Sequence, residues 1–400
     1  MPLVELETTL TDQERAFRDA ARRFAFEAMR PIGAELDRLP DPAQVIAPKS
    51  KLWGLFKQYN DLQLDALDLA GPELSLLERA RARFLVCEEM GYGDAGLAIS
   101  LGVAGFHRLF AQMSGRPELV ERFGPGNRDI GCWAVTEPDH GSDVLTVTEP
   151  HFGDPKMKPN CIARRHGDHY VIDGQKAAWV SNGTIAEVAT LFCTVDPSQG
   201  FKGGGVCLVP LDLPGVSRGK PLDKLGQRAL NQGEIFFDGV RIPADYMIIG
   251  PEAYAMVVET ILTLANATMG AIFVGLARAA LEHALEYAKQ RIQGGVPIFE
   301  HQGVKARLFR MFAQVEAARS LAWRVMIYNS TNPPQVHYSI ASKVFCTNTA
   351  FEVASGALQI FGGNGLSREY PIEKLLRDAR ASMIEDGCNE VLSLVGASKL

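Results

Sequence analysis

The order of apolar and polar positions divides the chain into a helical part, a β part and a second helical part. From residue 10 to about 125, apolar residues recur at helical spacing, as Phe17, Ala21 and Phe24 do. From about residue 130 the pattern changes to short apolar runs separated by turns, and long helical patterns return near Tyr254. Breaks in these later helices fall at 294–295, 332–334 and 362–365. We therefore expect an α+β chain that is mostly α.

Several element boundaries can be predicted from local signals. A helix is expected to begin at Thr11 or Asp12, because a capping side chain precedes acidic residues there. A second helix is expected from Leu76 to Met90. Asp173-Gly174 is typical of a hairpin turn between two strands. The strands expected in this region are 169–172, 177–180, 187–195, 205–209 and 234–237.

Composition narrows the class of protein. The chain is 46% hydrophobic and 22% charged, with a net charge of −6 and no basic tract, so no nucleic-acid partner is expected. Seven cysteines without C-x-x-C spacing favour reduced thiols and no metal site. The N-terminus lacks the pattern of a signal peptide, and no apolar run is expected to reach membrane-spanning length. A cytoplasmic location is expected, or the mitochondrial matrix if a leader was removed.

The stretch from Gln359 to Glu390 carries the densest candidate chemistry. An apolar helix ends at Phe361, and glycines at 362, 363 and 365 follow at once. Such glycines allow backbone N–H groups to approach an anion, although a simple helix stop is the more common reason for them. Pro371 is expected to open the next helix, which leads to the paired carboxylates Glu385 and Asp386 beside a glycine.

The order of residues in this stretch resembles the C-terminal signature of the acyl-CoA dehydrogenases, flavoproteins that oxidise acyl thioesters. The matching positions are Gln359, Gly362, Gly363, Gly365, Glu369, Lys374 and Asp378. The resemblance implies an N-terminal α-helical domain (1–129), a middle β-barrel (130–247) and a C-terminal four-helix bundle (248–400), with FAD as cofactor. The strand pattern alone does not separate a closed barrel from a sandwich.

Two further motifs resemble the flavin-binding segments of this family. In the segment 133–143, WAVTEPDHGSD, the resemblance places Trp133 and Thr136 at the flavin, and Gly141 and Ser142 at the edge shared by cofactor and substrate. In the segment 179–183, WVSNG, it places Trp179 beside the isoalloxazine ring and the Ser181 hydroxyl near its N5 atom. A lone tryptophan on a strand is otherwise most often a core residue.

The resemblance also implies that the FAD site needs two chains. In the family, residues equivalent to Arg291 and Gln302 contact the FAD of a neighbouring subunit, and an arginine fork suits a pyrophosphate. Gly294 replaces a usual phenylalanine here. A homotetramer built as a dimer of dimers is therefore expected. The remaining cofactor-binding residues implied by the resemblance are Gln359, Gly362, Gly363, Cys388 and Glu390.

The alignment places Asp386 at the family's catalytic glutamate, and the segment 386–391, DGCNEV, looks like a branch with Asp-Gly-x-x-Glu-Val. We predict Asp386 as the base, with Glu385 as the alternative. Adjacent side chains at a helix end point about 100° apart, so only one of the two is expected to face the flavin. Other relatives carry the base at the position of Ala265, which has no carboxylate. The substrate contacts implied are Ser142, Asn266 and Asp386.

The resulting hypothesis is an FAD-dependent acyl-CoA dehydrogenase that forms a 2,3-enoyl thioester and passes electrons to an electron-transfer flavoprotein. Two alternatives stay open: a flavin oxidase similar to the nitroalkane oxidases, and a catalytically degenerate subunit kept for assembly. The residues 68–72 replace a usual Gly-Gly loop at the substrate mouth. The sequence leaves open the acyl length, branching or ring structure, the electron acceptor, and whether coenzyme A or an acyl carrier protein bears the acyl group.

Overall fold

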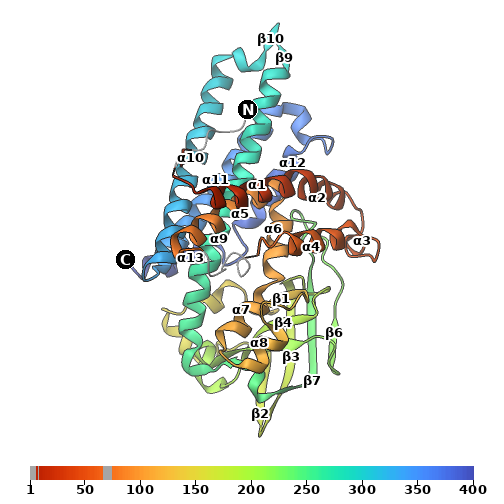
Figure 1. Cartoon of the computed structure of the whole chain (residues 1–400), viewed down its shortest axis with the longest axis vertical. Helices are drawn as coiled ribbons and strands as arrows, with labels where there is room; N and C mark the ends of the chain where they lie inside the picture. Colours follow the sequence, from red (N-terminus) through yellow and green to blue (C-terminus); the bar gives the residue numbers. More distant parts are fainter. Residues whose placement is uncertain (1–5, 8, 66–73) are drawn as a thin grey trace.

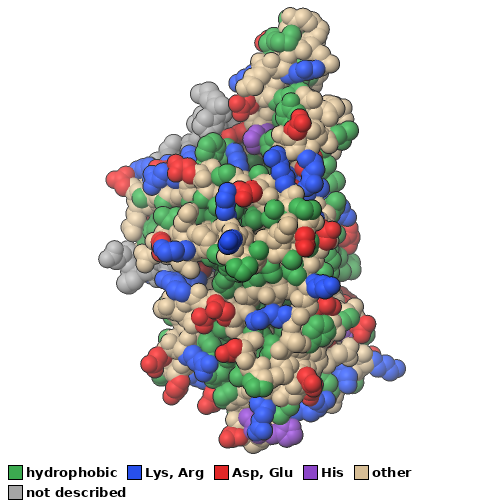
Figure 2. Space-filling view, turned by 90° about the vertical axis from the view of Figure 1, so that its right-hand side faces the viewer, with side chains coloured by type: hydrophobic (Ala, Val, Ile, Leu, Met, Phe, Trp, Pro, Cys, Tyr) green, Lys and Arg blue, Asp and Glu red, His purple; other side chains and the backbone are tan. Residues whose placement is uncertain are grey.

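A computed structural model of the chain describes residues 6–7, 9–65 and 74–400. Within these residues, eight short or medium α-helices come first, a β domain follows, and long helices complete the molecule (Figure 1). The segment 68–72 lies outside the described residues. On the face shown in Figure 2, basic and acidic side chains are interspersed.

The N-terminal region is helical, as predicted. Thr11 caps the first helix, and its side chain and that of Glu14 form a reciprocal capping box. The second predicted helix extends three residues beyond the expected end at Met90. The elements are α1 (Asp12–Phe24), a π-helical stretch (Ala25–Met29), α2 (Arg30–Asp37), α3 (Pro42–Val45), α4 (Lys51–Asp61), α5 (Leu76–Gly93), α6 (Ala95–Val103), α7 (Phe106–Met113) and α8 (Pro117–Phe123).

The β domain is one eight-stranded sheet in which part of the sheet closes on itself. Its main path runs β6-β7-β3-β1-β4-β5-β8. Both β1 and β2 pair with β3 and with β4, as closure into a barrel requires. The strands are β1 (Gly131–Ala134), β2 (Ile162–His166), β3 (His169–Ser181), β4 (Val188–Thr194), β5 (Gly204–Pro210), β6 (Val216–Arg218), β7 (Gln232–Pro243) and β8 (Met247–Ile249).

The predicted hairpin at Asp173-Gly174 is wrong. Both residues lie inside β3, which continues to Ser181, and the turn falls instead between His166 and His169. Gly174 has a φ of +134° at a register shift between β3 and β7, and a Cβ there would lie 2.6 Å from the Cα of Cys161. Gly174 therefore lies in a β-bulge where two backbone segments approach closely. A glycine within a strand pattern can indicate such a bulge as well as a turn.

Long helices form the C-terminal part. They are α9 (Pro251–Gln290), α10 (Gln302–Thr331), α11 (Val336–Phe361), α12 (Ile372–Ser382) and the shorter α13 (Asn389–Ala397). α11 packs on α9 and α10, and α12 packs on α11 and α9. At the far end of α9, the two short strands β9 (Ile292–Gln293) and β10 (Val296–Pro297) form a projecting hairpin (Figure 1).

The expectation that no apolar run is long enough for a membrane is wrong for α9. By length and composition this 40-residue helix could cross one, since an 18-residue window has a mean hydropathy of 1.7. However, 72% of that window is buried within the protein. The high hydropathy therefore reflects contacts with other helices, including α5, α10 and α11.

A close crossing of α5 and α9 depends on glycine. A Cβ at Gly275 would lie 2.0 Å from the carbonyl oxygen of Glu88 and 2.6 Å from the amide nitrogen of Tyr92. Gly275→Ala is therefore expected to lower the free energy of unfolding by about 1–3 kcal/mol, because the helices must separate. Gly54→Ala is the control, since α4 has open space there and alanine should stabilise by about 0.5–1 kcal/mol. Equal effects of the two changes in denaturant unfolding would contradict this account.

Candidate active site

A cavity of about 490 Å³ lies where the β domain meets the C-terminal helices. Its walls come from α6 and α7, the loop after β1, the end of β3, the segment 224–227, the first half of α9, and the end of α12 with the segment after it. Elements far apart in sequence therefore share one site. The residues predicted at the active site that line this cavity are Trp133, Thr136, Gly141, Ser142, Trp179, Ser181, Asn266, Glu385 and Asp386.

The two tryptophans of the cavity differ in their environment. Trp133 packs among Phe106, Phe110 and Phe192, with ring centroids 4.8–6.1 Å away. Trp179 is 57% exposed although it lies on a strand. An aromatic ring left open beside a cavity is suited to contact a planar ligand, and it is not a core tryptophan. The chemistry of this wall fits the isoalloxazine ring of a flavin.

A hydrogen bond joins the loop after β1 to the C-terminal carboxylate segment. The Ser142 hydroxyl accepts a hydrogen bond from the backbone N–H of Cys388 at 2.9 Å. The serine predicted at the cofactor and substrate edge therefore also holds the carboxylate segment in place. Cys388 itself lies beside the cavity and does not line it.

Glu385 and Asp386 both line the cavity, but they do not lie at a helix end as expected. Helix α12 ends at Ser382, and Asp386 has a left-handed φ of +51°. The two side chains therefore do not follow the 100° spacing of a helix. A left-handed φ at a residue other than glycine is uncommon and often marks a functional turn.

Buried lysines and carboxylates surround this turn. Burial raises the pKa of Asp386, and the nearby Lys343 ammonium opposes that rise. Burial and the charge of Asp386 raise the pKa of Glu385 to about 7. Burial lowers the pKa of Lys343 to about 8, and its ammonium donates to the carbonyl of Gly387 at 2.7 Å and to Asn389 Oδ1 at 2.9 Å. Lys343 thus fixes the backbone that carries Asp386.

A second network positions Glu385, and sequence reasoning missed it. Gln227 Nε2 donates to Glu385 Oε1 at 2.6 Å, and the backbone N–H of Gln227 donates to Asp378 Oδ1. Lys374 bridges Asp378 Oδ2 at 2.5 Å and Asp94 Oδ2 at 2.6 Å. The segment 223–228 was expected to be structural only. Its glutamine lies 158 positions before Glu385, and no local pattern signals that contact.

The other predicted cofactor residues lie outside the cavity. Arg291 and Gln302 lie at the base of the projecting hairpin and are exposed, and Gln359, Gly362, Gly363 and Glu390 are also exposed. A Cβ at Gly362 or Gly363 would meet open space. This single chain therefore does not bring these groups to the cavity, and their roles stay predictions.

The raised pKa of Glu385 predicts a pH-dependent stability. The folded protein holds this proton more tightly than the unfolded chain, whose glutamates have a pKa near ~4.3, so stability falls as the pH rises from about 4.3 to about 7. Glu385→Gln removes the free-energy cost of ionising this buried carboxylate. The variant is expected to gain about 1–3 kcal/mol at pH 8 and progressively less towards pH 5, measured by denaturant unfolding of the FAD-loaded protein. An exposed control, Glu121→Gln, should show no such trend, and a gain that is constant with pH would contradict the assignment.

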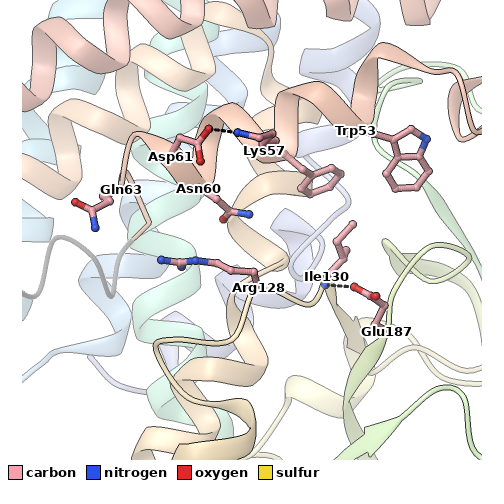
Figure 3. Close-up of a pocket in the computed structure, with 9 residues that line it drawn as sticks. Trp53, Lys57, Asn60, Asp61, Gln63, Arg128, Ile130 and Glu187 are labelled. Atoms are coloured by element: carbon pink, nitrogen blue, oxygen red, sulfur yellow. Dashed lines mark hydrogen bonds and ion pairs between the residues drawn. The ribbon is translucent and has the colours of Figure 1, made fainter.

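A second hollow, of about 560 Å³, opens at the surface between α4 and the start of the β domain (Figure 3). It contains the exposed ion pair Lys57–Asp61, 2.6 Å, and the Glu187 carboxylate, which accepts from the backbone N–H of Ile130. None of the predicted site residues lines it.

Comparison with known proteins finds similar sequences and structures. Residues 255–400 match the family model described as acyl-CoA dehydrogenase, C-terminal domain, and residues 132–240 match the middle domain of the same family. The short-chain specific acyl-CoA dehydrogenase of Rattus norvegicus mitochondria is 30% identical over 400 residues, covering 98% of this chain and 90% of the relative.

Solved structures resemble the whole chain. Butyryl-CoA dehydrogenase from Megasphaera elsdenii is 26% identical with a TM-score of 0.85, covering 98% of this chain and 99% of that structure. A glutaryl-CoA dehydrogenase from Mycobacterium smegmatis in complex with FADH2 is 23% identical with a TM-score of 0.81, covering 98% and 96%. The predicted arrangement of a helical N-terminal region, a middle β domain and a helical C-terminal domain is confirmed.

Proposed function

Since the chain belongs to the acyl-CoA dehydrogenase family, we propose that it oxidises an acyl-CoA to the 2,3-enoyl thioester with Asp386 as the base. One observation carries this proposal. The Asp386 carboxylate lines the same cavity as Thr136, Trp179 and Ser181, which are the residues suited to a flavin ring. The base must lie beside the α-carbon and the hydride acceptor beside the β-carbon, so both must line one cavity.

The chain's own groups perform the proton chemistry. Burial raises the pKa of Asp386, which makes the carboxylate a stronger base when the substrate excludes water. Its backbone N–H would donate to the thioester oxygen, where negative charge develops as the α-proton leaves. Lys343 and Ser142 hold the backbone directly after Asp386, at the Gly387 carbonyl and the Cys388 N–H, which limits the movement of the carboxylate.

FAD, when bound, supplies the hydride acceptor. Thr136, Trp179 and Ser181 would hold its ring, and the exposed Arg291, Gln302, Gln359, Gly362 and Gly363 would bind the dinucleotide of a neighbouring subunit. These exposed residues lie outside the cavity of their own chain, so they would serve the cofactor of another subunit. This supports a homotetramer. An electron-transfer flavoprotein in the cytoplasm completes the proposal as electron acceptor.

An anaerobic screen of flavin reduction tests the function. The purified protein is mixed with straight, branched and cyclic acyl-CoAs, and the flavin absorbance should fall with at least one class. Rapid peroxide formation in air without thioester-dependent bleaching would favour the oxidase alternative. Failure to retain FAD would favour the degenerate assembly subunit.

A further inference from the structure

The side-chain amide of Gln232 joins a lysine to a hydroxyl on the cavity wall. Lys224 and Gln232 both line the cavity, and the Lys224 ammonium donates to Gln232 Oε1 at 2.8 Å. The ammonium also donates to the carbonyl oxygen of Leu230 at 2.7 Å, which holds it in place. At the other end of the amide, Gln232 Nε2 donates to Ser181 Oγ at 3.3 Å and to the carbonyl oxygen of Trp179 at 3.4 Å. These contacts form a hydrogen-bond relay, Lys224–Gln232–Ser181.

The lysine determines which way the amide faces. An ammonium has three donors and no acceptor, so only the oxygen end of an amide can lie against it. The carbonyl oxygen of Trp179 imposes the same orientation, because it only accepts and therefore faces the amide nitrogen. Gln232 must present its NH2 group to Ser181.

This orientation leaves the proton of the Ser181 hydroxyl for another acceptor. Ser181 and Gln232 are paired across β3 and β7, so the sheet holds the two side chains next to each other. A hydroxyl has one proton and two lone pairs, and the NH2 group of Gln232 engages one lone pair without accepting the proton. Ser181 is partly exposed at the cavity wall, and its hydroxyl donates to no group among the described residues. The proton is thus available to an acceptor held in the cavity.

We propose that Lys224 and Gln232 are positioning residues that fix the Ser181 hydroxyl as a hydrogen-bond donor to the flavin ring. The unprotonated ring nitrogens of an oxidised flavin are acceptors, so a donor of fixed direction matches them. Lys224 and Gln232 act here through Ser181. This inference rests on the proposed function, because that proposal places the flavin beside Ser181.

A lysine that only supplied positive charge to an anionic cofactor would behave differently. Its effect on FAD binding would be the same whether or not Ser181 carries a hydroxyl. The relay, in contrast, has no effect once the hydroxyl is removed. The coupling between Lys224 and Ser181 therefore separates the two roles.

A double-mutant cycle on the FAD-loaded protein measures this coupling. The dissociation constant of FAD is obtained from the flavin fluorescence released on serial dilution. Ser181→Ala should raise the constant about fivefold, as loss of one hydrogen bond implies. Lys224→Met should raise it by a similar factor, about fivefold, because the Gln232 amide can then turn its oxygen towards Ser181 and take the proton. In the Ser181→Ala background, Lys224→Met should change the constant less than about twofold.

The measurements are made at pH 6. Burial lowers the pKa of Lys224 to about 7, and the charges of Glu385 and Asp378 oppose that shift. The ammonium form therefore predominates at pH 6. A neutral amine has a lone pair and would no longer fix the direction of the amide.

Three further variants complete the test. Lys224→Arg keeps a group that only donates and should bind FAD within about twofold of the wild type. Gln232→Glu presents acceptor oxygens at both ends, so it should weaken FAD binding about as much as Ser181→Ala, and it replaces Lys224→Met in the cycle if that variant unfolds. Gln175→Leu is the matched control, because the Gln175 amide also bridges β3 and β7, to Glu234 at 3.0 Å, but does not line the cavity. Thermal unfolding checks the fold of each variant.

Equal effects of Lys224→Met with and without the Ser181 hydroxyl would overturn the inference, as would a Ser181→Ala protein that binds FAD like the wild type. Both results leave the dehydrogenase function standing if an acyl-CoA still bleaches the flavin. Bound FAD that no acyl-CoA reduces would defeat the proposed function while the coupling still supports the relay. A wild-type protein that retains no FAD would defeat both.

Discussion

Replacing Asp386 with asparagine is expected to lower the rate of flavin reduction by acyl-CoA by about 10²–10⁴-fold. The amide keeps the length of the side chain but does not accept the α-proton. Since the Lys343 and Ser142 contacts are made to the backbone of residues 387 and 388, the turn should keep its shape. Rapid mixing under anaerobic conditions measures the rate, with the absorbance spectrum confirming that FAD is retained.

Glu385→Gln is the matched control for that experiment. It replaces the neighbouring carboxylate in the same cavity, and Gln227 Nε2 retains an acceptor in the new amide. We expect less than about a tenfold change in rate for an alkyl substrate, because this residue does not take the α-proton. An active Asp386→Asn enzyme beside an inactive Glu385→Gln enzyme would reverse the assignment of the base.

Replacing Lys374 with methionine is expected to lower the free energy of unfolding by about 3–5 kcal/mol. The change leaves the buried carboxylates of Asp94 and Asp378 without the ammonium that both contact. Asp94 also caps α6 through the backbone N–H of Leu97, so the loss extends into the N-terminal helices. Denaturant unfolding of the FAD-loaded protein measures the change.

Lys57→Met provides the comparison for this prediction. Lys57 also pairs with an aspartate, Asp61, at 2.6 Å, but both side chains are largely exposed. Its loss should change stability by less than about 0.5 kcal/mol. Similar losses in the two variants would mean that the buried network around Lys374 adds nothing beyond a surface ion pair.

The sequence predicted the features that depend on local signals. Helical periodicity and capping residues located α1 and α5, and the motifs around Thr136 and Trp179 identified two walls of the cavity. These predictions succeeded because each depends on a few consecutive residues whose side-chain pattern or backbone preference is strong. The exact domain boundaries and the assignments of individual cofactor contacts stay predictions.

Other features depend on contacts that no local pattern contains. Asp173-Gly174 has the composition of a turn, but pairing with β7 keeps it inside a strand. The Gln227–Glu385 contact joins segments of different domains. The orientation of Glu385 and Asp386 depends on a left-handed φ at an aspartate, where helical spacing does not apply. In each case tertiary structure overrides the local preference.

The cavity walls also bear on how such a protein could be re-engineered. Because its lining is drawn from the loop after β1, strand β3, helix α9 and the segment beyond α12, no contiguous fragment contains the site. Grafting only the C-terminal helices onto another member of the family should transplant Asn266 and Glu385 without the Gln227 that orients the latter. Chimeras intended to exchange acyl preference would need to carry residues 223–228 along with the helical half.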